Sequence, residues 1–196
     1  MADLKRPAHF VFRSDENLTP EQARLRIETD EIFDNDPVRD KKLSRRRIAR
    51  ERVMQVLYSA AMNERSTDEL FTELILSDTQ LNEQAIEFSR TLLRNFSAHH
   101  DEVDSLITER LANWDFKRVA LIDKILLQIG IVEFKYLPEI PPKATINELI
   151  EIAKDFSTDE SSKFINGILH KIKDDLIERG EMNKEGRGLI DETIGE

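Results

Sequence analysis

Residues 117–136, KRVALIDKILLQIGIVEFKY, decide the fold of this 196-residue chain. Apolar side chains point in almost every direction around a helix drawn through this stretch, which is typical of a helix enclosed by other helices. Gly130 in its middle costs about 1 kcal/mol of helix propensity relative to alanine, so we expect close helix packing at that position. The stretch therefore predicts a central, buried helix.

Proline and glycine are almost absent from the region that leads up to the end of this helix. The six prolines are at positions 7, 20, 37, 138, 141 and 142, and the first glycine is Gly130. Strand-rich domains need regular turn residues, so the interval favours helices with short connections. The Asn166-Gly167 pair is a hairpin signal in other settings, but its apolar neighbours recur at helical spacing. The predicted fold class is all-α.

Capping signals and apolar periodicity place further helices on both sides of the central one. The expected N-caps are Ser44, Ser66, Thr145 and Ser157, and a further helix is expected to start near Asn82. Another helix is expected after the polar stretch at residues 99–101, and Gly180 is expected to end the last helix. The sequence thus predicts a bundle of about seven helices in two small subdomains.

Acidic or weakly patterned segments flank this bundle. Residues 1–43 are predicted to be a loosely ordered acidic extension, with a short helix starting at Thr19-Pro20. The helical domain is expected to span residues 44–180, with subdomains at 44–100 and 101–180. Residues 181–196 are predicted to be a disordered tail.

Composition narrows the classes of function. The chain has no cysteine, which excludes disulfides and thiolate metal sites, and we expect a cytoplasmic protein because no signal peptide or membrane-length apolar run is present. His99 and His100 are not at a metal-ligand spacing, and His170 with Asp174 does not complete a site. No phosphate-binding glycine loop or nucleophile motif occurs either. We therefore expect a protein that is not an enzyme and needs no cofactor or metal.

Basic residues are concentrated in residues 39–52, which hold eight cations and two acids in a chain of net charge −10. Such a patch is typical of an anion-binding surface, and a nucleic-acid backbone is the leading candidate. Arginine suits phosphate because its planar guanidinium donates paired hydrogen bonds. A solvated helix start is the alternative, but cations are unfavourable near the positive end of a helix dipole. The candidate residues are Arg45, Arg46, Arg47 and Arg50.

Two aromatic rings lie where they could stack on unpaired bases. Tyr58 follows Arg47 by eleven residues, which places both on one ridge of a helix. Phe164 is expected at the margin of the core beside Lys163. Rings and cations along one surface form a platform for single-stranded nucleic acid. The alternative for each ring is a partly buried core residue.

Three separate segments resemble the NusB family of transcription antitermination factors. RRRIARE at 45–51, followed by QVLY at 55–58, is similar to the arginine-rich first helix of the family. TINELIEIAK at 145–154 resembles its AINEAIELAK helix, and KFINGIL at 163–169 resembles its KFVNGVL motif. The segments follow the family's order. The chain departs from the family pattern at Gln128, Val132 and His170.

The resemblance implies an all-helical protein that binds boxA-type single-stranded RNA of ribosomal RNA operons. It also implies a heterodimer with NusE, a small-subunit ribosomal protein, within the antitermination complex of RNA polymerase; a homodimer is the arrangement to consider without NusE. The RNA contacts that carry over are Arg45, Arg46, Arg47, Arg50, Tyr58, Glu160, Ser161, Lys163 and Phe164. Asp123 falls where the family places an acidic residue facing NusE, and an acidic chain suits a basic partner.

Two alternatives stay open at this point. The chain could be an accessory RNA-binding domain of the kind fused to ribosomal RNA methyltransferases, or a helical adaptor that binds only proteins or dimerises. RNA binding should weaken steeply with salt, whereas an apolar dimer should not.

Overall fold

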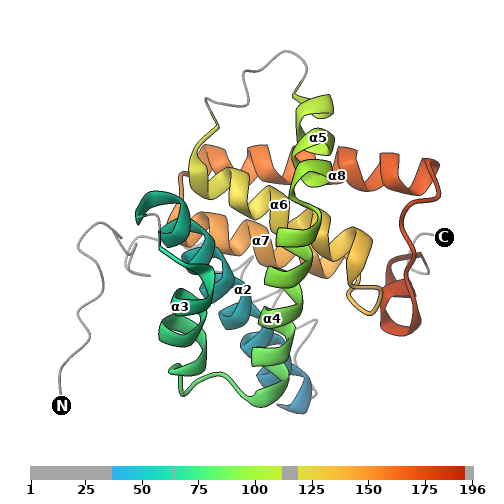
Figure 1. Cartoon of the computed structure of the whole chain (residues 1–196). Helices are drawn as coiled ribbons and strands as arrows, with labels where there is room; N and C mark the ends of the chain where they lie inside the picture. Colours follow the sequence, from blue (N-terminus) through green and yellow to red (C-terminus); the bar gives the residue numbers. More distant parts are fainter. Residues whose placement is uncertain (1–36, 64, 112–118, 193–196) are drawn as a thin grey trace, which may run out of the picture.

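A computed structural model describes residues 37–63, 65–111 and 119–192 (Figure 1). These residues form seven α-helices and no strand, which confirms the all-α prediction. The helices are α2 (Pro37–Asn63), α3 (Thr67–Phe71), α4 (Glu83–Ala98), α5 (His100–Arg110), α6 (Leu121–Tyr136), α7 (Pro142–Phe156) and α8 (Asp159–Glu178). A π-helical turn, η2 (Thr72–Leu76), continues α3, and a 3-10 helix, η4 (Gly186–Glu192), ends the described chain. The short helix expected near Thr19 lies outside the described residues.

Helix α6 is the central helix that the sequence predicted. It contacts α2, α4, α5, α7 and α8, and every residue from Ile125 to Phe134 is buried. Gly130 allows the close approach of neighbouring helices, since a Cβ atom there would lie 2.7 Å from Leu169 Cδ2 and 3.0 Å from Leu149 Cδ1. The predicted reason for a glycine inside this helix is therefore confirmed.

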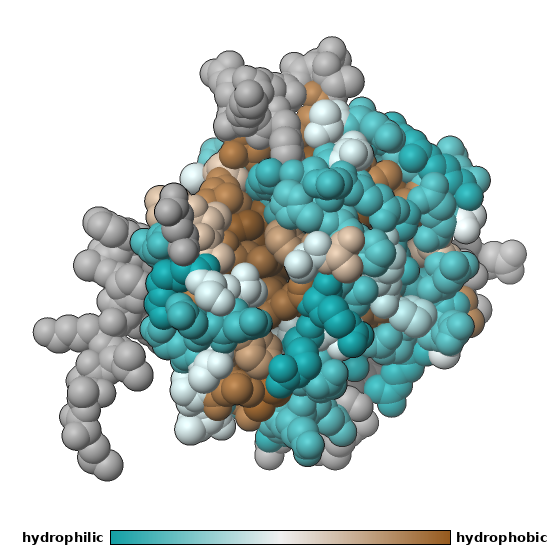
Figure 2. All heavy atoms as spheres, in the orientation of Figure 1, coloured by the Kyte–Doolittle hydropathy of each residue, from teal (hydrophilic) through white to brown (hydrophobic). Residues whose placement is uncertain are grey.

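The other helices lie around α6 in two groups. In Figure 1, α2, α3 and α4 pack together, and α7 and α8 run alongside α6 across the molecule. One continuous apolar cluster includes residues from both groups. The division into subdomains at residue 100 therefore stays a prediction, although that residue is the first of α5. Figure 2 shows one face of the molecule, on which a hydrophobic band crosses a mostly hydrophilic surface.

Of the four predicted N-caps, Ser66 is confirmed, and α4 starts next to Asn82, as expected. The Ser66 hydroxyl accepts from the Asp68 amide at 3.3 Å, and the Asn82 side chain accepts from the Ala85 amide at 3.0 Å. Each satisfies an amide that a helix start leaves without an intrahelical partner. Helices α3 and α4 therefore begin where the sequence predicted.

The other three predicted caps are wrong. Helix α2 begins at Pro37 and α7 at Pro142, because proline is well suited to the first position of a helix. Ser44 and Thr145 consequently lie inside helices. Helix α8 is capped by Thr158, which accepts from the Ser161 amide at 3.2 Å, rather than by Ser157.

The C-terminal segment is ordered through residue 192, contrary to the predicted disorder of residues 181–196. Gly180 ends α8 at φ +65°, as predicted, and the Glu181 amide donates to the Leu176 carbonyl at 2.8 Å. Lys184 then donates to the Glu133 and Leu137 carbonyls at the end of α6, at 2.8 and 3.0 Å. The segment is thus fastened by polar contacts that leave no apolar periodicity in the sequence. Residues 193–196 lie outside the described residues.

Candidate nucleic-acid interface

The arginine run begins well inside α2. Because the helix starts at Pro37, Arg45 lies about two turns from its first residue, beyond the reach of the N-terminal dipole. The arginines are therefore not disfavoured by the helix dipole, and the dipole gives no reason to reject a solvated surface without a ligand. What distinguishes the arginines is instead the partner that each one finds.

Arg45 and Arg46 face the start of α4. Arg45 is exposed, and the two arginines line a small pocket with Asn82, Gln84 and Ala85. The guanidinium of Arg46 is half-buried, with its carbon 5.5 Å from the centre of the Phe88 ring. Burial lowers the pKa of Arg46, and the neighbouring charge of Arg50 lowers it further. Neither has a carboxylate ion-pair partner among the described residues, so both keep donors for an external anion.

Arg47 joins α2 to the end of α7. Its Nη2 lies 2.7 Å from Asp155 Oδ2, and its Nε lies 3.3 Å from Glu51 Oε1. Burial alone would lower the pKa of Arg47, but the carboxylates of Glu148 and Asp155 raise it. An incoming phosphate must therefore share or replace the carboxylates that already hold this guanidinium.

Arg50 is a core residue, which corrects its assignment as an RNA contact. Its Nε and Nη2 donate to Glu133 Oε1 and Oε2 at 2.6 and 2.8 Å, and Thr145 Oγ1 donates to Glu133 Oε2 at 2.7 Å. Arg50 is 2 % exposed and Glu133 is 0 % exposed. This geometry satisfies both buried charges, as a buried ion pair requires. The guanidinium therefore links α2, α6 and α7 and is not available to a ligand.

Glu148 is a half-buried residue near Arg47 and Arg50, and one of its carboxylate oxygens, Oε2, is buried. Its Oε2 has no hydrogen-bond partner among the described residues. Burial raises the pKa of Glu148, and the charges of Arg50 and Arg47 oppose this effect only in part. The arginines on this side of α2 thus lie close to carboxylates of the protein itself.

The start of α8 is held by a network of hydroxyl groups around Asp123. Ser157 Oγ and Ser161 Oγ donate to Asp123 Oδ1 and Oδ2, each at 2.7 Å. Asp123 is only 6 % exposed and Ser161 only 7 % exposed. Ser161 is therefore fixed in the network and positions the helix start; its hydroxyl is not a free base-reading group.

Four other predicted residues on α8 and α2 remain accessible to different degrees. Glu160 and Lys163 are exposed, and no ion pair of Lys163 is found among the described residues. Phe164 and Tyr58 are half-buried rings packed against the core. Each ring thus combines a packing role with an accessible part. Stacking on an unpaired base and a purely structural role both remain open for each ring.

One corner of the structure is formed by the arginine run and the end of α7, the helix that precedes α8. The Arg47–Asp155 ion pair places the arginine run beside the turn between α7 and α8, close to Glu160, Ser161 and Lys163 in sequence. Tyr58 lies about 16 Å along the α2 axis from Arg47, three turns away. It belongs to the same helix but is separated from this corner, which we call the α2–α8 corner (Arg45–Arg47 and Glu160–Phe164).

Sequence reasoning missed the residues that hold the corner together. Glu133 and Asp155 each bind an arginine more than eighty positions away, and nothing in a single sequence marks such a pair. Thr145 could have been recognised as a buried hydroxyl only after the start of α7 was placed correctly. The one available signal was Pro142, a favoured first residue of a helix.

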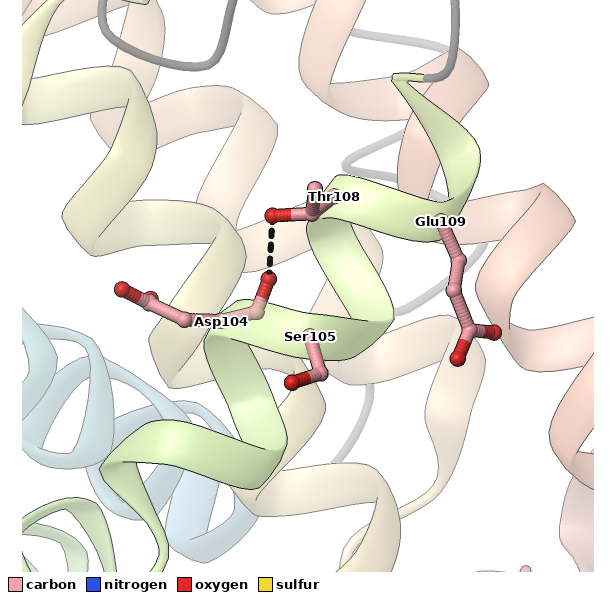
Figure 3. Close-up of a pocket in the computed structure, with 4 residues that line it drawn as sticks. All are labelled: Asp104, Ser105, Thr108 and Glu109. Atoms are coloured by element: carbon pink, nitrogen blue, oxygen red, sulfur yellow. Dashed lines mark hydrogen bonds between the residues drawn. The ribbon is translucent and has the colours of Figure 1, made fainter.

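A hollow on α5 is not a second chemical site. Its lining residues are Asp104, Ser105, Thr108 and Glu109 (Figure 3). The Ser105 and Thr108 hydroxyls donate to carbonyls of their own helix at 2.8 Å. In the described part of the chain, no group of three or more acidic or histidine side chains could hold a metal ion. No helix there has the length and apolar character needed to cross a membrane.

These features define a helical protein in which a basic helix and the start of another helix carry cations and a half-buried aromatic ring, Phe164. A model of the NusB family matches residues 47–174, and the chain belongs to the NusB family. The transcription antitermination protein NusB of Bacillus mycoides is 41 % identical over 133 residues, which cover 67 % of this chain and 99 % of the relative. The corresponding protein of Chloroherpeton thalassium is 40 % identical over 149 residues, covering 76 % and 70 %.

Solved structures agree with this assignment. T. maritima NusB is 30 % identical and matches with a TM-score of 0.61, covering 66 % of this chain and 90 % of that one. A crystal structure of the antitermination factors NusB and NusE in complex with dsRNA contains a chain that is 25 % identical. It matches with a TM-score of 0.61 and covers 67 % of this chain and 98 % of that one. The predicted family is therefore confirmed.

Proposed function

We propose that this chain is a transcription antitermination factor that binds boxA-type single-stranded RNA of ribosomal RNA operons together with NusE. Through that complex it supports processive transcription by RNA polymerase. The α2–α8 corner is the observation that carries the proposal. It combines Arg45, Arg46 and Lys163, which have no carboxylate ion-pair partner among the described residues, with the accessible part of the Phe164 ring. Family membership and a solved NusB–NusE–dsRNA complex support the same function. The chain acts by binding and positioning RNA.

Each residue at the corner has a defined part in the proposal. Arg45, Arg46 and Lys163 bind phosphates, because their charges have no carboxylate ion-pair partner among the described residues. Arg47 joins them once a phosphate competes with Asp155. Phe164, and Tyr58 further along α2, stack on bases, an interaction worth about 1–3 kcal/mol per base and tolerant of base identity. Glu160 accepts hydrogen bonds from exocyclic amines and supplies base selectivity.

Asp123 belongs to the proposed NusE side of the protein. Its carboxylate is committed to the two serine hydroxyls, so it acts by fixing the start of α8 for the partner. NusE would also supply positive charge that an acidic chain lacks. We therefore expect the heterodimer to bind RNA more tightly than this chain alone.

The test is a titration of a boxA RNA and an unrelated single strand of equal length at several salt concentrations, with and without NusE. Replacing both Arg45 and Lys163 with alanine should weaken binding to both strands and reduce the salt slope by about 1.4, or 0.7 per lost single-strand phosphate contact. The matched control is the double variant Lys171→Ala with Arg179→Ala. It also removes two cations, one in the second half of α8 and one directly after its last residue. An equal loss from the control pair would contradict the proposed surface.

Two further variants separate stacking from base reading. Phe164→Ala should weaken binding to boxA and to the unrelated strand alike, whereas Glu160→Ala should narrow the difference between them. The unfolding midpoint of each variant is measured in parallel. If Phe164→Ala lowers the midpoint but leaves RNA affinity unchanged, the ring is a core residue only.

A further inference from the structure

The C-terminal segment, residues 181–192, contains an exposed cation, Arg187, near Arg46 of the arginine run. η4 follows α8 and contacts α7, and residues 181–192 lie beyond the family match at 47–174. This segment therefore adds to the family domain in this chain. Its most exposed basic residue near α2 is Arg187.

Backbone contacts fix where the segment lies. The Glu185 amide donates to the Pro138 carbonyl at 3.0 Å, and a Cβ atom on Gly188 would lie 2.0 Å from that same oxygen. Lys184 adds two hydrogen bonds to carbonyls at the end of α6. The segment thus closes over the turn between α6 and α7, and only a residue without a side chain fits at position 188.

The segment and the arginine run meet at Glu133. Lys184 donates to the Glu133 carbonyl, and the Glu133 carboxylate holds Arg50, which lies one helical turn after Arg46 on α2. Glu139, the residue after Pro138, is near enough to raise the pKa of Arg46 in opposition to burial, and the charge of Arg187 lowers it. Arg46 and Arg187 therefore approach the turn from two elements, α2 and η4. Arg187 has no ion pair or hydrogen bond from its side chain among the described residues. Glu139 is the carboxylate that accompanies these two cations.

Helix α7 relates this position to the α2–α8 corner. Arg47 binds Asp155 in the last turn of α7, whereas the C-terminal segment is fastened to Pro138, which precedes the first turn of α7. The fifteen residues of α7 span about 22 Å. Arg47 thus lies at the end of α7, and the segment that carries Arg187 is fastened before its start.

We propose that the anion-binding surface continues past the arginine run onto the C-terminal segment, where Arg187 binds a phosphate of the same single-stranded RNA. The inference rests on the proposed function, since it extends that surface in one direction. The segment has a double role: its backbone fastens it to the α6–α7 turn, and the fastening holds Arg187 beside Arg46. One bound phosphate would relieve the repulsion between the half-buried guanidinium of Arg46 and the exposed guanidinium of Arg187.

The experiment uses the full chain in complex with NusE and a boxA RNA. Arg187→Ala should lower affinity by about three- to tenfold at low salt and reduce the salt slope by about 0.7, as expected for one lost single-strand phosphate contact. Arg187→Glu should lower it further. Arg179→Ala is the matched control, because it removes an exposed arginine that is paired with Glu109 at the end of α8; its affinity should equal that of the unmodified chain.

A second variant tests the docking without changing any charge. Gly188→Ala should displace the segment from Pro138 and lower RNA affinity as much as Arg187→Ala, while circular dichroism shows the helices intact. If both variants bind RNA as tightly as the unmodified chain, while the Arg45 and Lys163 double variant does not, the extension is wrong and the proposed function stands. If Arg187→Ala weakens the binding of NusE and not of RNA, the partner proposed for this cation is wrong.

Discussion

The arginine run of α2 and the first turn of α8, the two parts of the proposed interface, are held in different ways. The arginines are held by carboxylates: Arg50 by Glu133 inside the core, and Arg47 by Asp155 and Glu51 near the surface. The start of α8 is held by neutral hydroxyl groups that share the single buried carboxylate of Asp123. Lys163, an exposed charge of α8, therefore has no ion pair among the described residues. In the arginine run, Arg47 and Arg50 are neutralised by carboxylates of the protein.

This difference shows that charge in a sequence is not the same as charge available at a surface. Four arginines lie in residues 45–50, yet one is buried in an ion pair and one is shared between two acids. The surface that remains is weaker than the sequence suggests, which agrees with a need for a basic partner.

Arg50→Ala should be the most damaging change, because it leaves Glu133 buried without its partner. Breaking one side of a buried ion pair typically costs about 3–5 kcal/mol of unfolding free energy. Denaturant unfolding measures this cost, and Arg45→Ala, an exposed arginine on the same helix, should change stability by less than about 0.5 kcal/mol. Comparable costs for the two variants would mean that Arg50 is not held in the core.

Asp123→Ala should cost less, about 1–3 kcal/mol, since it removes an acceptor from two partly buried hydroxyls and leaves no unpaired charge. A double-mutant cycle with Ser161→Ala measures the coupling between the two side chains. We expect the combined variant to be less destabilised than the sum of the single variants. Strict additivity would argue against the network as described.

Asp155→Asn should release Arg47 and change RNA binding more than stability. The ion pair is partly exposed, so its loss should cost under about 1 kcal/mol of unfolding free energy. Non-specific single strands should bind several-fold more tightly at low salt, because one more guanidinium becomes available. Glu151→Gln, which removes a nearby acid of α7 that pairs with Lys154 instead, is the control. Unchanged RNA affinity in Asp155→Asn would show that the ion pair does not compete with phosphate.

Glu148→Gln should give the smallest effect, visible in the pH dependence of stability. Burial raises the pKa of Glu148 in the folded state, so this carboxyl favours folding most when protonated. Its stabilising contribution is present below the pKa of the unfolded chain and is lost as pH rises through the raised pKa of the folded state. Glutamine should therefore increase stability at neutral pH and flatten the curve above about pH 4.3, measured by thermal unfolding at a series of pH values. A decrease at neutral pH would contradict this assignment.

The fold was predictable because its strongest signals are local. The apolar stretch at 117–136 identified α6, and Gly130 was correctly attributed to close packing before any neighbour was known. Ser66 and Asn82 identified helix starts because each acts on amides only two or three residues away. The starts of α2, α7 and α8 were missed where a proline or a neighbouring threonine competed with the expected cap.

The site was predictable only as a set of residue types. Arg45, Arg46 and Lys163 could be selected from charge, but the burial of Arg50 depends on Glu133, which is distant in sequence. The ordered C-terminal segment was missed for a related reason. Backbone hydrogen bonds and a lysine bound to carbonyls hold it, and neither produces an apolar pattern.

The location of RNA on the protein is the claim on which the account depends, and a backbone amide NMR titration with boxA RNA in the presence of NusE tests it most directly. We predict that the largest RNA-dependent changes in amide chemical shift fall on residues 45–47 and 160–164, with smaller changes near Arg187. The exposed face of α5 around Ser105 should remain unchanged. Shifts concentrated on α5 or α3, with residues 45–47 and 160–164 unaffected, would contradict the proposed interface.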